Sequence, residues 1–195
     1  MISLAVLASG SGSNAERLFT YFENHPKIRV VCFLTNNPKA GVIERGHRLG
    51  VPTVVFNRKM FSGSTTVSQI LTKFEIDWVI LGGFLWLIPT SLIAQFPDKI
   101  INIHPALLPK FGGKGMWGHH VHEAVVAAKE EKSGITIHLV NEKYDEGELI
   151  FQAECAVNQV DTPDDVAAKV QALEQVHFPV VVEDYILKHY SFTSS

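Results

Sequence analysis

The chain opens on the stretch Ile2-Ser3-Leu4-Ala5-Val6-Leu7-Ala8-Ser9-Gly10-Ser11-Gly12-Ser13-Asn14, and this stretch decides the fold class. Its first seven residues are mostly apolar, which predicts a strand over 2–8 that is buried on both faces. A glycine-rich loop follows, and a helix is expected over 14–23. A buried strand that leads through such a loop into a helix is typical of an α/β protein with a parallel sheet.

The same rhythm continues to the middle of the chain and then changes. We expect further strands over 28–34, 53–56, 78–81 and 100–104, and helices over 41–49, 65–74 and from about Thr90. After Pro105 come a glycine-rich loop over 111–118, a helix over 121–129, and strands over 135–140 and 149–157 joined by a polar turn. These elements predict one domain over 1–195, with a doubly wound, mostly parallel sheet and an antiparallel C-terminal portion.

The last helix is expected from Asp161-Thr162-Pro163 to Glu183 or beyond, because an acidic cap and an early proline favour a helix start. Pro179 should kink or split this helix, since proline cannot donate the hydrogen bond that a helix interior needs. The tail over 191–195 is expected to fray.

Composition excludes several classes of protein. The 195 residues are 46% hydrophobic and 19% charged, with a net charge of -3 and no basic block, which argues against binding to nucleic acid or to an anionic membrane. The longest apolar stretch, over 78–89, contains two glycines and is too short to span a bilayer. Cys32 and Cys155 stand in apolar surroundings and are expected to be buried, reduced thiols. We therefore expect a soluble, cytoplasmic protein.

The loop Ser9-Gly10-Ser11-Gly12-Ser13-Asn14 has the composition of a phosphate cradle. Glycines let the backbone approach a ligand, and exposed N–H groups at a helix start attract an anion. The loop matches neither a P-loop nor a dinucleotide fingerprint, and no acid follows the second strand at Leu34-Thr35-Asn36. This favours a monophosphate on a small substrate over a nucleotide cofactor. The alternative is a tight strand-to-helix turn capped by Ser13.

Asn102 and His104 lie two residues apart at the end of the strand over 100–104, so their side chains project to the same face. Pro105 ends that strand, and the carboxyl ends of parallel strands are where open α/β sheets bind ligands. An amide donor beside an imidazole suits a reaction in which a carbonyl oxygen becomes an oxyanion. The alternative is that both side chains only cap the strand and bond to the backbone of the loop.

Asp145 lies on the turn Tyr144-Asp145-Glu146-Gly147 between the last two strands. A carboxylate close to His104 would hold the imidazole in one tautomer, favour its charged form and raise its pKa. The alternative is a solvated acid on a turn.

Other segments carry weaker signals. The apolar and aromatic stretch over 82–87 could line a slot for a flat heterocycle, or it could be core. His119, His120 and His122 lack the partners that complete a zinc site, so we expect no metal. Gln171 and Glu174 share a helix face and could bond a substrate.

Three features together resemble the folate-dependent formyltransferases: the loop over 9–14, the run Asn102-Ile103-His104-Pro105-Ala106-Leu107-Leu108-Pro109, and Asp145 further along. The similarity extends over essentially the whole chain, including Val170-Gln171-Ala172-Leu173-Glu174. The Asn-x-His-Pro and Asp set is shared with methionyl-tRNA formyltransferases and formyltetrahydrofolate hydrolases. The first loop is similar to the phosphate site of the phosphoribosylglycinamide formyltransferases, which favours that branch of the family.

The resemblance implies a Rossmann-like formyltransferase fold. It implies transfer of a formyl group from 10-formyltetrahydrofolate, a cosubstrate, to the amine of glycinamide ribonucleotide in purine biosynthesis, without a metal. It implies catalytic roles for Asn102, His104 and Asp145. The residues implied for the ribonucleotide are Gly12, Ser13, Asn14, Gln171 and Glu174. Those implied for folate are Leu85, Trp86, Leu87, Ile88, Asn102, Val140, Asn141 and Tyr144. The half over 1–104 would bind the phosphosugar, and the half over 105–195 would bind folate and carry out catalysis.

The chain departs from the family pattern in places. Trp86 stands where some members carry an arginine in the folate loop, and another family arginine corresponds to Ser64 or a near neighbour. These departures concern folate affinity rather than reaction type. The segment over 111–120 is longer than in some members, and we expect a mobile loop over the site.

Two other functions stay open at this point. A formyltetrahydrofolate hydrolase would use water as the nucleophile, and it leaves the loop over 9–14 unexplained. A non-catalytic phosphosugar-binding module would have no folate site. A methionyl-tRNA formyltransferase would need an added nucleic-acid-binding region. We expect small-molecule substrates as partners, no nucleic acid and no membrane, and a monomer or homodimer.

Overall fold

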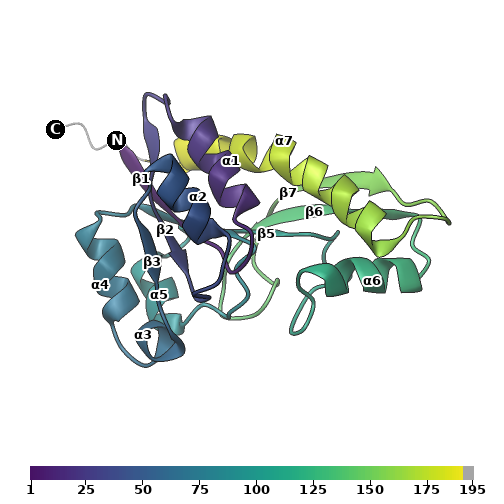
Figure 1. Ribbon diagram of the computed structural model, residues 1–195, viewed down its shortest axis with the longest axis horizontal. Helices are drawn as coiled ribbons and strands as arrows, with labels where there is room; N and C mark the ends of the chain where they lie inside the picture. Colours follow the sequence, from purple (N-terminus) through teal and green to yellow (C-terminus); the bar gives the residue numbers. More distant parts are fainter. Residues whose placement is uncertain (191–195) are drawn as a thin grey trace.

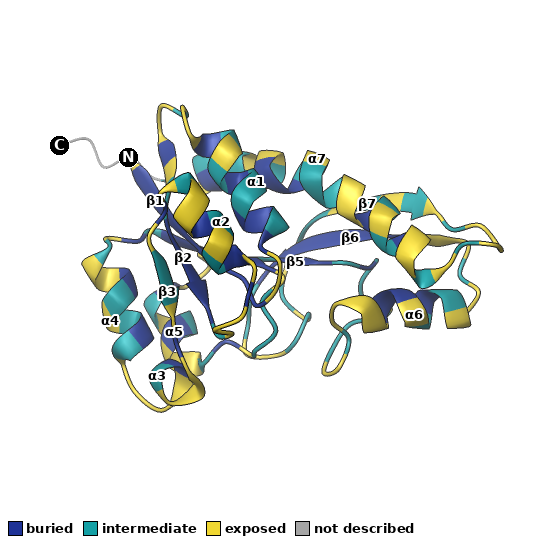
Figure 2. Ribbon diagram, viewed as in Figure 1, coloured by how far each residue is buried: buried dark blue, intermediate teal, exposed yellow. Residues whose placement is uncertain are grey.

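The apolar run at the start of the chain forms β1 (Ile2–Leu7), and all six of its residues are buried. In the computed structural model, which describes residues 1–190, alternate residues of β1 enter two hydrophobic clusters on opposite faces of the sheet. Leu4 and Val6 belong to one cluster, and Ala5 and Leu7 to the other. The sheet is therefore covered on both faces, as predicted, and its central strands are the most deeply buried part of the fold (Figures 1 and 2).

The sheet has seven strands in the order β3-β2-β1-β4-β5-β6-β7. Its parallel part comprises β1, β2 (Ile28–Thr35), β3 (Thr53–Val55), β4 (Trp78–Gly82) and β5 (Ile100–His104). Its antiparallel part comprises β6 (Lys132–Leu139) and β7 (Leu149–Ala156). The predicted fold class is confirmed, although β6 begins at Lys132, earlier than the expected Ile135.

Helices pack on both faces of the sheet (Figure 1). The first hydrophobic cluster receives side chains from α1 (Ser13–Phe22), α2 (Val42–Leu49), α6 (His119–Ala127) and α7 (Pro163–His189). The second receives side chains from α3 (Arg58–Ser62), α4 (Thr66–Lys73) and α5 (Thr90–Gln95). The sequence patterns did not predict α3. Its start is explained by Asn57, whose side-chain oxygen accepts a hydrogen bond from the Met60 N–H at 3.0 Å.

The final helix, α7, runs without interruption from Pro163 to His189, so the expected split at Pro179 is wrong. Proline removes the N–H that would bond to the carbonyl of Gln175, four residues earlier. Arg17 on α1 supplies the missing donor, because its Nε–H donates to that carbonyl at 2.8 Å. A contact between two helices thus replaces the backbone hydrogen bond that Pro179 cannot make.

The topology brings three loops to one edge of the sheet. β1 lies between β2 and β4, so the chain leaves β1 in one direction to build β2 and β3 and later returns to build β4 and β5. Ligands of open α/β sheets bind at such a switch point, outside the carboxyl ends of the strands. The loops after β1, β4 and β5 meet there.

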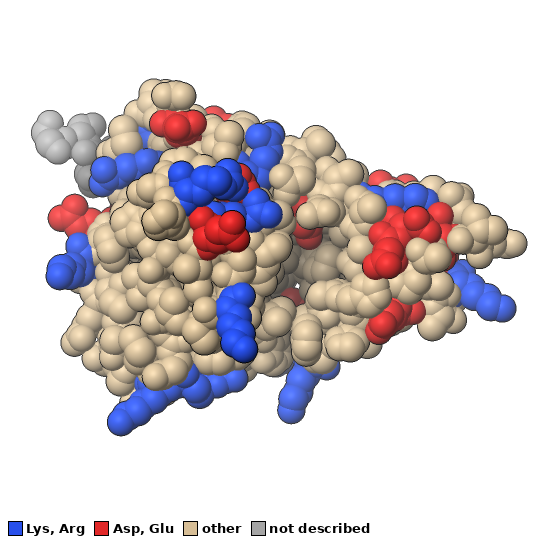
Figure 3. All heavy atoms as spheres, in the orientation of Figure 1, with Lys and Arg blue, Asp and Glu red and all other residues tan. Residues whose placement is uncertain are grey.

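Three further expectations concern exposure. Cys32 is buried, whereas Cys155 is half-buried and not buried as expected: it packs against the first hydrophobic cluster from β7, an edge strand in which no residue is fully buried. No helix within residues 1–190 is long and apolar enough to cross a membrane. The predicted fraying of 191–195 lies outside the described residues. On the face shown in Figure 3, basic and acidic side chains are interspersed.

Candidate active site

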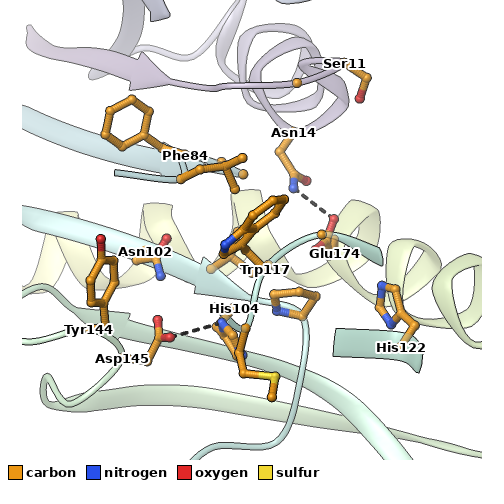
Figure 4. A pocket seen from close by; sticks show the side chains of 18 of the residues that line it. Ser11, Asn14, Phe84, Asn102, His104, Trp117, His122, Tyr144, Asp145 and Glu174 are labelled. Atoms are coloured by element: carbon orange, nitrogen blue, oxygen red, sulfur yellow. Dashed lines mark hydrogen bonds and ion pairs between the residues drawn. The ribbon is translucent and has the colours of Figure 1, made fainter. Parts of the chain in front are cut away.

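A cavity of about 600 Å³ opens at the switch point of the sheet. Its walls are the loops after β1 and β4, the end of β5, the segment over 113–118 and the turn before β7 (Figure 4). Nine of the residues that the sequence indicated line it: Gly12, Ser13, Asn14, Leu85, Asn102, His104, Tyr144, Asp145 and Glu174. Residues from both ends of the chain therefore meet around one space.

One end of the cavity is the start of α1. Gly12 is the residue before this helix and has a φ of 78°, in the left-handed region that favours glycine. A Cβ added there would lie 2.6 Å from the Cβ of Val42, so the loop packs too closely for any side chain. Ser13 is the first residue of α1 and makes no cap, so the alternative of a Ser13-capped turn is wrong. The first N–H groups of a helix lack partners inside it, and here they adjoin the cavity.

The side-chain amide of Asn14 is hydrogen-bonded to residues of α7. Its Nδ2 donates to the Glu174 carboxylate at 2.9 Å, and its Oδ1 accepts from Gln175 Nε2 at 3.4 Å. Burial raises the pKa of Glu174 to about 7, despite the opposing hydrogen bond from Asn14. The side chain of Asn14 thus ties α1 to α7 and is not a free group in the cavity.

The other end of the cavity carries Asn102 at the end of β5. Its Nδ2 lies 3.0 Å from Nε2 of His138, which stands directly opposite on β6. His138 Nδ1 donates to the Leu139 carbonyl at 2.7 Å, so its Nε2 accepts from the Asn102 amide. His138 therefore fixes which way Asn102 presents its nitrogen. The sequence analysis missed this histidine, because nothing local to it reveals its partner across the sheet.

His104 is the second side chain at this end, and only 4% of it is exposed. Its Nε2 donates to the carbonyl of Phe111 at 2.8 Å, which leaves Nδ1 facing Asp145 Oδ2 at 3.5 Å (Figure 4). The imidazole rings of His104 and His138 thus each donate one N–H to a backbone carbonyl. The alternative that Asn102 and His104 only cap the strand and bond to loop backbone accounts for the Phe111 contact, but not for Asp145 beside His104 or His138 beside Asn102.

Asp145 is held by three groups from different segments. Its Oδ2 accepts from the Gly113 N–H at 2.9 Å, and its two oxygens lie 3.5 Å from His104 and 3.6 Å from His138. Its side chain is 11% exposed, so the alternative of a solvated acid is wrong. Burial raises the pKa of Asp145, but its contact with the His138 imidazole, the nearby His104 imidazole and the hydrogen bond from the Gly113 N–H outweigh it, so the pKa of this carboxyl lies below its usual value.

The pKa of His104 moves against expectation. Burial lowers it, and the nearby Asp145 carboxylate and the Phe111 carbonyl offset that effect only in part. The net direction is downward, so the free protein holds this imidazole largely neutral at pH 7. The sequence placed the carboxylate beside the ring correctly, but it could not weigh that charge against the burial of the ring.

The residues implied for folate divide into two sets. Leu85 and Tyr144 line the cavity, and the Leu87 N–H donates to the Tyr144 hydroxyl at 3.1 Å, which joins the loop after β4 to the turn of Asp145. Ile88 is buried in the second hydrophobic cluster, and the side chain of Asn141 bonds within its own turn. Neither these two residues nor Trp86, Leu87 and Val140 belong to the lining of the cavity.

Trp86 instead belongs to an aromatic cluster with Phe56, Phe61 and Phe84. The guanidinium of Arg58 lies 3.9 Å from the centre of the Trp86 ring, at the distance of a cation–π contact. The chain therefore does place an arginine next to the loop after β4, from α3 and not from the positions that the family pattern suggested.

The three histidines near the start of α6 do not act as one group. His119 and His120 are exposed and lie 3.6 and 3.1 Å from Glu123, whereas His122 is buried and lines the cavity. Within residues 1–190, no three His, Cys, Asp or Glu side chains come together as a metal-binding group. Gln171 lies apart from the main cavity, in a smaller lobe beside Glu174. Phe84 lines the cavity from the stretch over 82–87, as one interpretation of that stretch predicted, and Met116 and Trp117 line it from the segment over 111–120.

Comparisons with known proteins agree with this geometry. The family model described as formyl transferase matches residues 2–182. The chain is 40% identical to a chloroplastic phosphoribosylglycinamide formyltransferase of Arabidopsis thaliana, over 86% of this chain and 59% of the plant protein. It is 31% identical to the trifunctional purine biosynthetic protein adenosine-3 of Gallus gallus, over 93% of this chain and 18% of the bird protein.

A solved structure has the same fold. The phosphoribosylglycinamide formyltransferase of Bacillus halodurans matches with a TM-score of 0.87 and 30% identity, over 99% of this chain and 100% of the other. The present chain spans little more than half the length of the plant relative. The family match covers nearly all of the chain, and so the chain belongs to the formyl transferase family.

Proposed function

We propose that the protein transfers a formyl group from 10-formyltetrahydrofolate to the amine of glycinamide ribonucleotide, in purine biosynthesis. One observation carries this proposal: Asn102, His104 and Asp145 meet at one end of a cavity whose other end is the start of α1. A binding site for an anion and a site that stabilises an oxyanion thus share one space. The printed names of the relatives support the same reaction.

In this proposal the phosphate binds the N–H groups of Gly12, Ser13 and Asn14. The positive end of α1 and the open backbone donors favour an anion there. Folate enters between the loop after β4 and the turn of Asp145, which the bond between Leu87 and Tyr144 holds together. Residues 1–104 then supply most of the phosphosugar site, and residues 105–195 supply much of the folate site.

The chemical step begins when the neutral amine of the substrate attacks the formyl carbon. Negative charge develops on the formyl oxygen, and Asn102 donates its second N–H to that charge. A proton taken up from solvent on His104 Nδ1, beside the Asp145 carboxylate, adds a positive charge close to that oxygen. Removing one such donor typically costs about 3 kcal/mol of transition-state stabilisation.

Protons balance without a covalent enzyme intermediate. The attacking nitrogen gains a bond to the formyl carbon and loses a proton, and the folate nitrogen loses that carbon and gains a proton. Asp145 is the carboxylate base at the reacting end. With a bridging water it would carry the proton from the attacking amine to the folate nitrogen. The formylated ribonucleotide and tetrahydrofolate then leave.

The test is incubation of the protein with both substrates while folate absorbance is followed, with a control that lacks the ribonucleotide. We expect tetrahydrofolate and formylated ribonucleotide to appear together, and only when both substrates are present. Release of formate in the control would instead identify a hydrolase. No turnover, together with no heat of folate binding in a calorimeter, would identify a phosphosugar-binding module.

The proposal also includes the setting in which the protein acts. Two small molecules are its substrates, and the net charge of -3 without a basic block supports the expectation of no nucleic-acid or membrane partner. We propose a cytoplasmic monomer or homodimer. Light scattering on the purified protein gives its mass in solution, and fractionation of the source cells gives its location.

A further inference from the structure

A smaller lobe of about 250 Å³ lies beside the main cavity, between the first turn of α6 and the middle of α7. Three residues, Gly118, His122 and Glu174, line both spaces, so the lobe is a side branch of the site already described. His119 and Gln171 complete its polar wall. The catalytic step as derived above uses none of the polar side chains of this branch.

His122 is the unexplained member of this wall. It is 7% exposed, and its Nδ1 is shielded from solvent without a hydrogen-bond partner. Within the described part of the chain its ring makes no hydrogen bond at all. Buried polar side chains nearly always have partners, and Nε2, the ring nitrogen that is not shielded, is the one that a ligand in the cavity can reach.

The surroundings of the ring define what it offers to a ligand. An imidazolium needs acceptors for two N–H groups, and Nδ1 has none, so the ring is neutral. Burial lowers the pKa of His122, and the nearby His119 and His104 imidazoles lower it further, which agrees with a neutral ring. The proton then belongs on Nε2, which is the nitrogen not shielded from the cavity. His122 is therefore a neutral hydrogen-bond donor.

We propose that His122 binds the ribonucleotide by donating from Nε2 to a hydroxyl oxygen of its ribose. The proposal rests on the proposed function, because the phosphate is assigned to the start of α1 and the amine to Asn102 and His104. The ribose must lie between these points, where Glu174 adjoins Asn14 and shares its lobe with His122. Figure 4 shows His122 on the same side of the cavity as Glu174, across from Asn102 and Tyr144.

The first test is steady-state kinetics of three variants. His122→Phe keeps the ring shape but has no donor, so we expect KM for the ribonucleotide to rise about tenfold, with kcat within about threefold and KM for folate unchanged. His122→Gln places an amide nitrogen near the position of Nε2 and should recover most of the loss. His122→Asn places its amide near Nδ1 and should not. His120→Phe changes an exposed neighbour and is the matched control.

The second test identifies the hydroxyl. Ribonucleotide analogues that lack the 2′- or the 3′-hydroxyl should bind less well to the natural protein, and one of them should lose nothing further in His122→Phe. If the loss of affinity from removing either hydroxyl simply added to the loss from His122→Phe, the inference would be overturned. An unchanged KM for the ribonucleotide in His122→Phe would also overturn it. Circular dichroism shows whether each variant is folded. If His122→Phe does not fold, the difference in KM between His122→Gln and His122→Asn still tests the inference.

Binding of ribose 5-phosphate, measured by calorimetry, separates this inference from the proposed function. A protein that binds ribose 5-phosphate about tenfold less tightly as His122→Phe, but transfers no formyl group, supports the role of His122 and contradicts the proposed reaction. If the natural protein and His122→Phe transfer the formyl group equally well and bind ribose 5-phosphate equally well, the role of His122 is contradicted and the proposed reaction is not.

Discussion

The two ends of the cavity are built from different chemical groups. The end at the start of α1 presents backbone N–H groups, placed by the left-handed Gly12 and its contact with Val42. The end at β5 presents titratable side chains, placed by bonds across the sheet and to the segment over 111–113. The first end has fixed partial charges and the second has charges that change with protonation. We infer that the first end binds and the second end reacts, and each change below is chosen to separate the two roles.

The largest effect is expected for Asp145→Asn at the reacting end. The variant keeps the shape of the side chain but loses the charge that faces His104 at 3.5 Å and His138 at 3.6 Å. We expect kcat to fall about 10²- to 10³-fold, as for the loss of one group that stabilises an oxyanion, and KM for the ribonucleotide to change little. Steady-state kinetics measure both values.

The control for this change is Glu146→Gln, the next residue on the same turn. Glu146 is exposed and pairs only with Lys143, so its loss should leave kcat within about twofold. An equal loss of kcat in both variants would show that the turn as a whole, and not the Asp145 carboxylate, supports turnover.

The second effect concerns Glu174, which joins the binding end to α7. Its pKa is raised from 4.5 to about 7, so the folded protein holds this proton over a pH range in which the unfolded chain has lost it. The contribution of Glu174 to the free energy of unfolding therefore falls by about 3 kcal/mol in total as the pH rises from about 4.5 to about 7. Glu174→Gln cannot ionise and should escape that loss.

Urea denaturation at pH 5 and pH 8 measures this difference. His104 and His122, whose pKa values are lowered, favour the folded state as pH rises, but they do so equally in both proteins. Glu174→Gln should therefore gain stability relative to the natural protein between pH 5 and pH 8. Glu148→Gln, an exposed acid, should not, and a parallel pH dependence of all three proteins would refute the raised pKa.

The third effect is expected for Gly12→Ala at the binding end. An alanine strains the left-handed backbone and pushes against Val42, so the N–H groups at the start of α1 must move. We expect KM for the ribonucleotide to rise about tenfold while kcat stays within about threefold. Gly10→Ala is the matched control, because a Cβ there meets nothing within 4 Å. A fall in kcat without a change of KM would reverse the roles of the two ends.

The smallest effect is expected for Arg58→Met, outside the cavity. Its guanidinium stacks on Trp86 and supplies a positive charge near the proposed folate path. An exposed cation–π contact contributes about 0.5–1 kcal/mol, so KM for 10-formyltetrahydrofolate should rise about threefold without a change in kcat. Lys59→Met removes a charge of the same sign from the next position and should leave KM unchanged.

The sequence predicted the binding end better than the reacting end, for a physical reason. The strand, loop and first helix over 2–22 are consecutive, so their apolar run and glycines determine them locally. Asn102 and His104 were found because strand periodicity is also local. His138 was missed because its role depends on lying opposite Asn102 in a sheet pair that joins distant segments. The split at Pro179 was wrong because the compensating donor, Arg17, comes from the other end of the chain.

Two features of the site escaped the sequence patterns for a common reason, one at each end of the cavity. The pKa of His104 was expected to rise because of Asp145, but burial of the ring determines the net direction. The hydrogen bond from the Asn14 amide to Glu174, far along the chain, was likewise not predicted. Burial and long-range partners are properties of the folded chain, and no pattern over a few residues contains them.

The separation of binding from reaction is tested most directly by titrating glycinamide ribonucleotide into Asp145→Asn in a calorimeter. We predict a dissociation constant within about threefold of that of the natural protein, although the same preparation has lost nearly all turnover. A dissociation constant weakened as strongly as turnover would contradict the separation, because Asp145 would then serve the binding end as much as the reacting end.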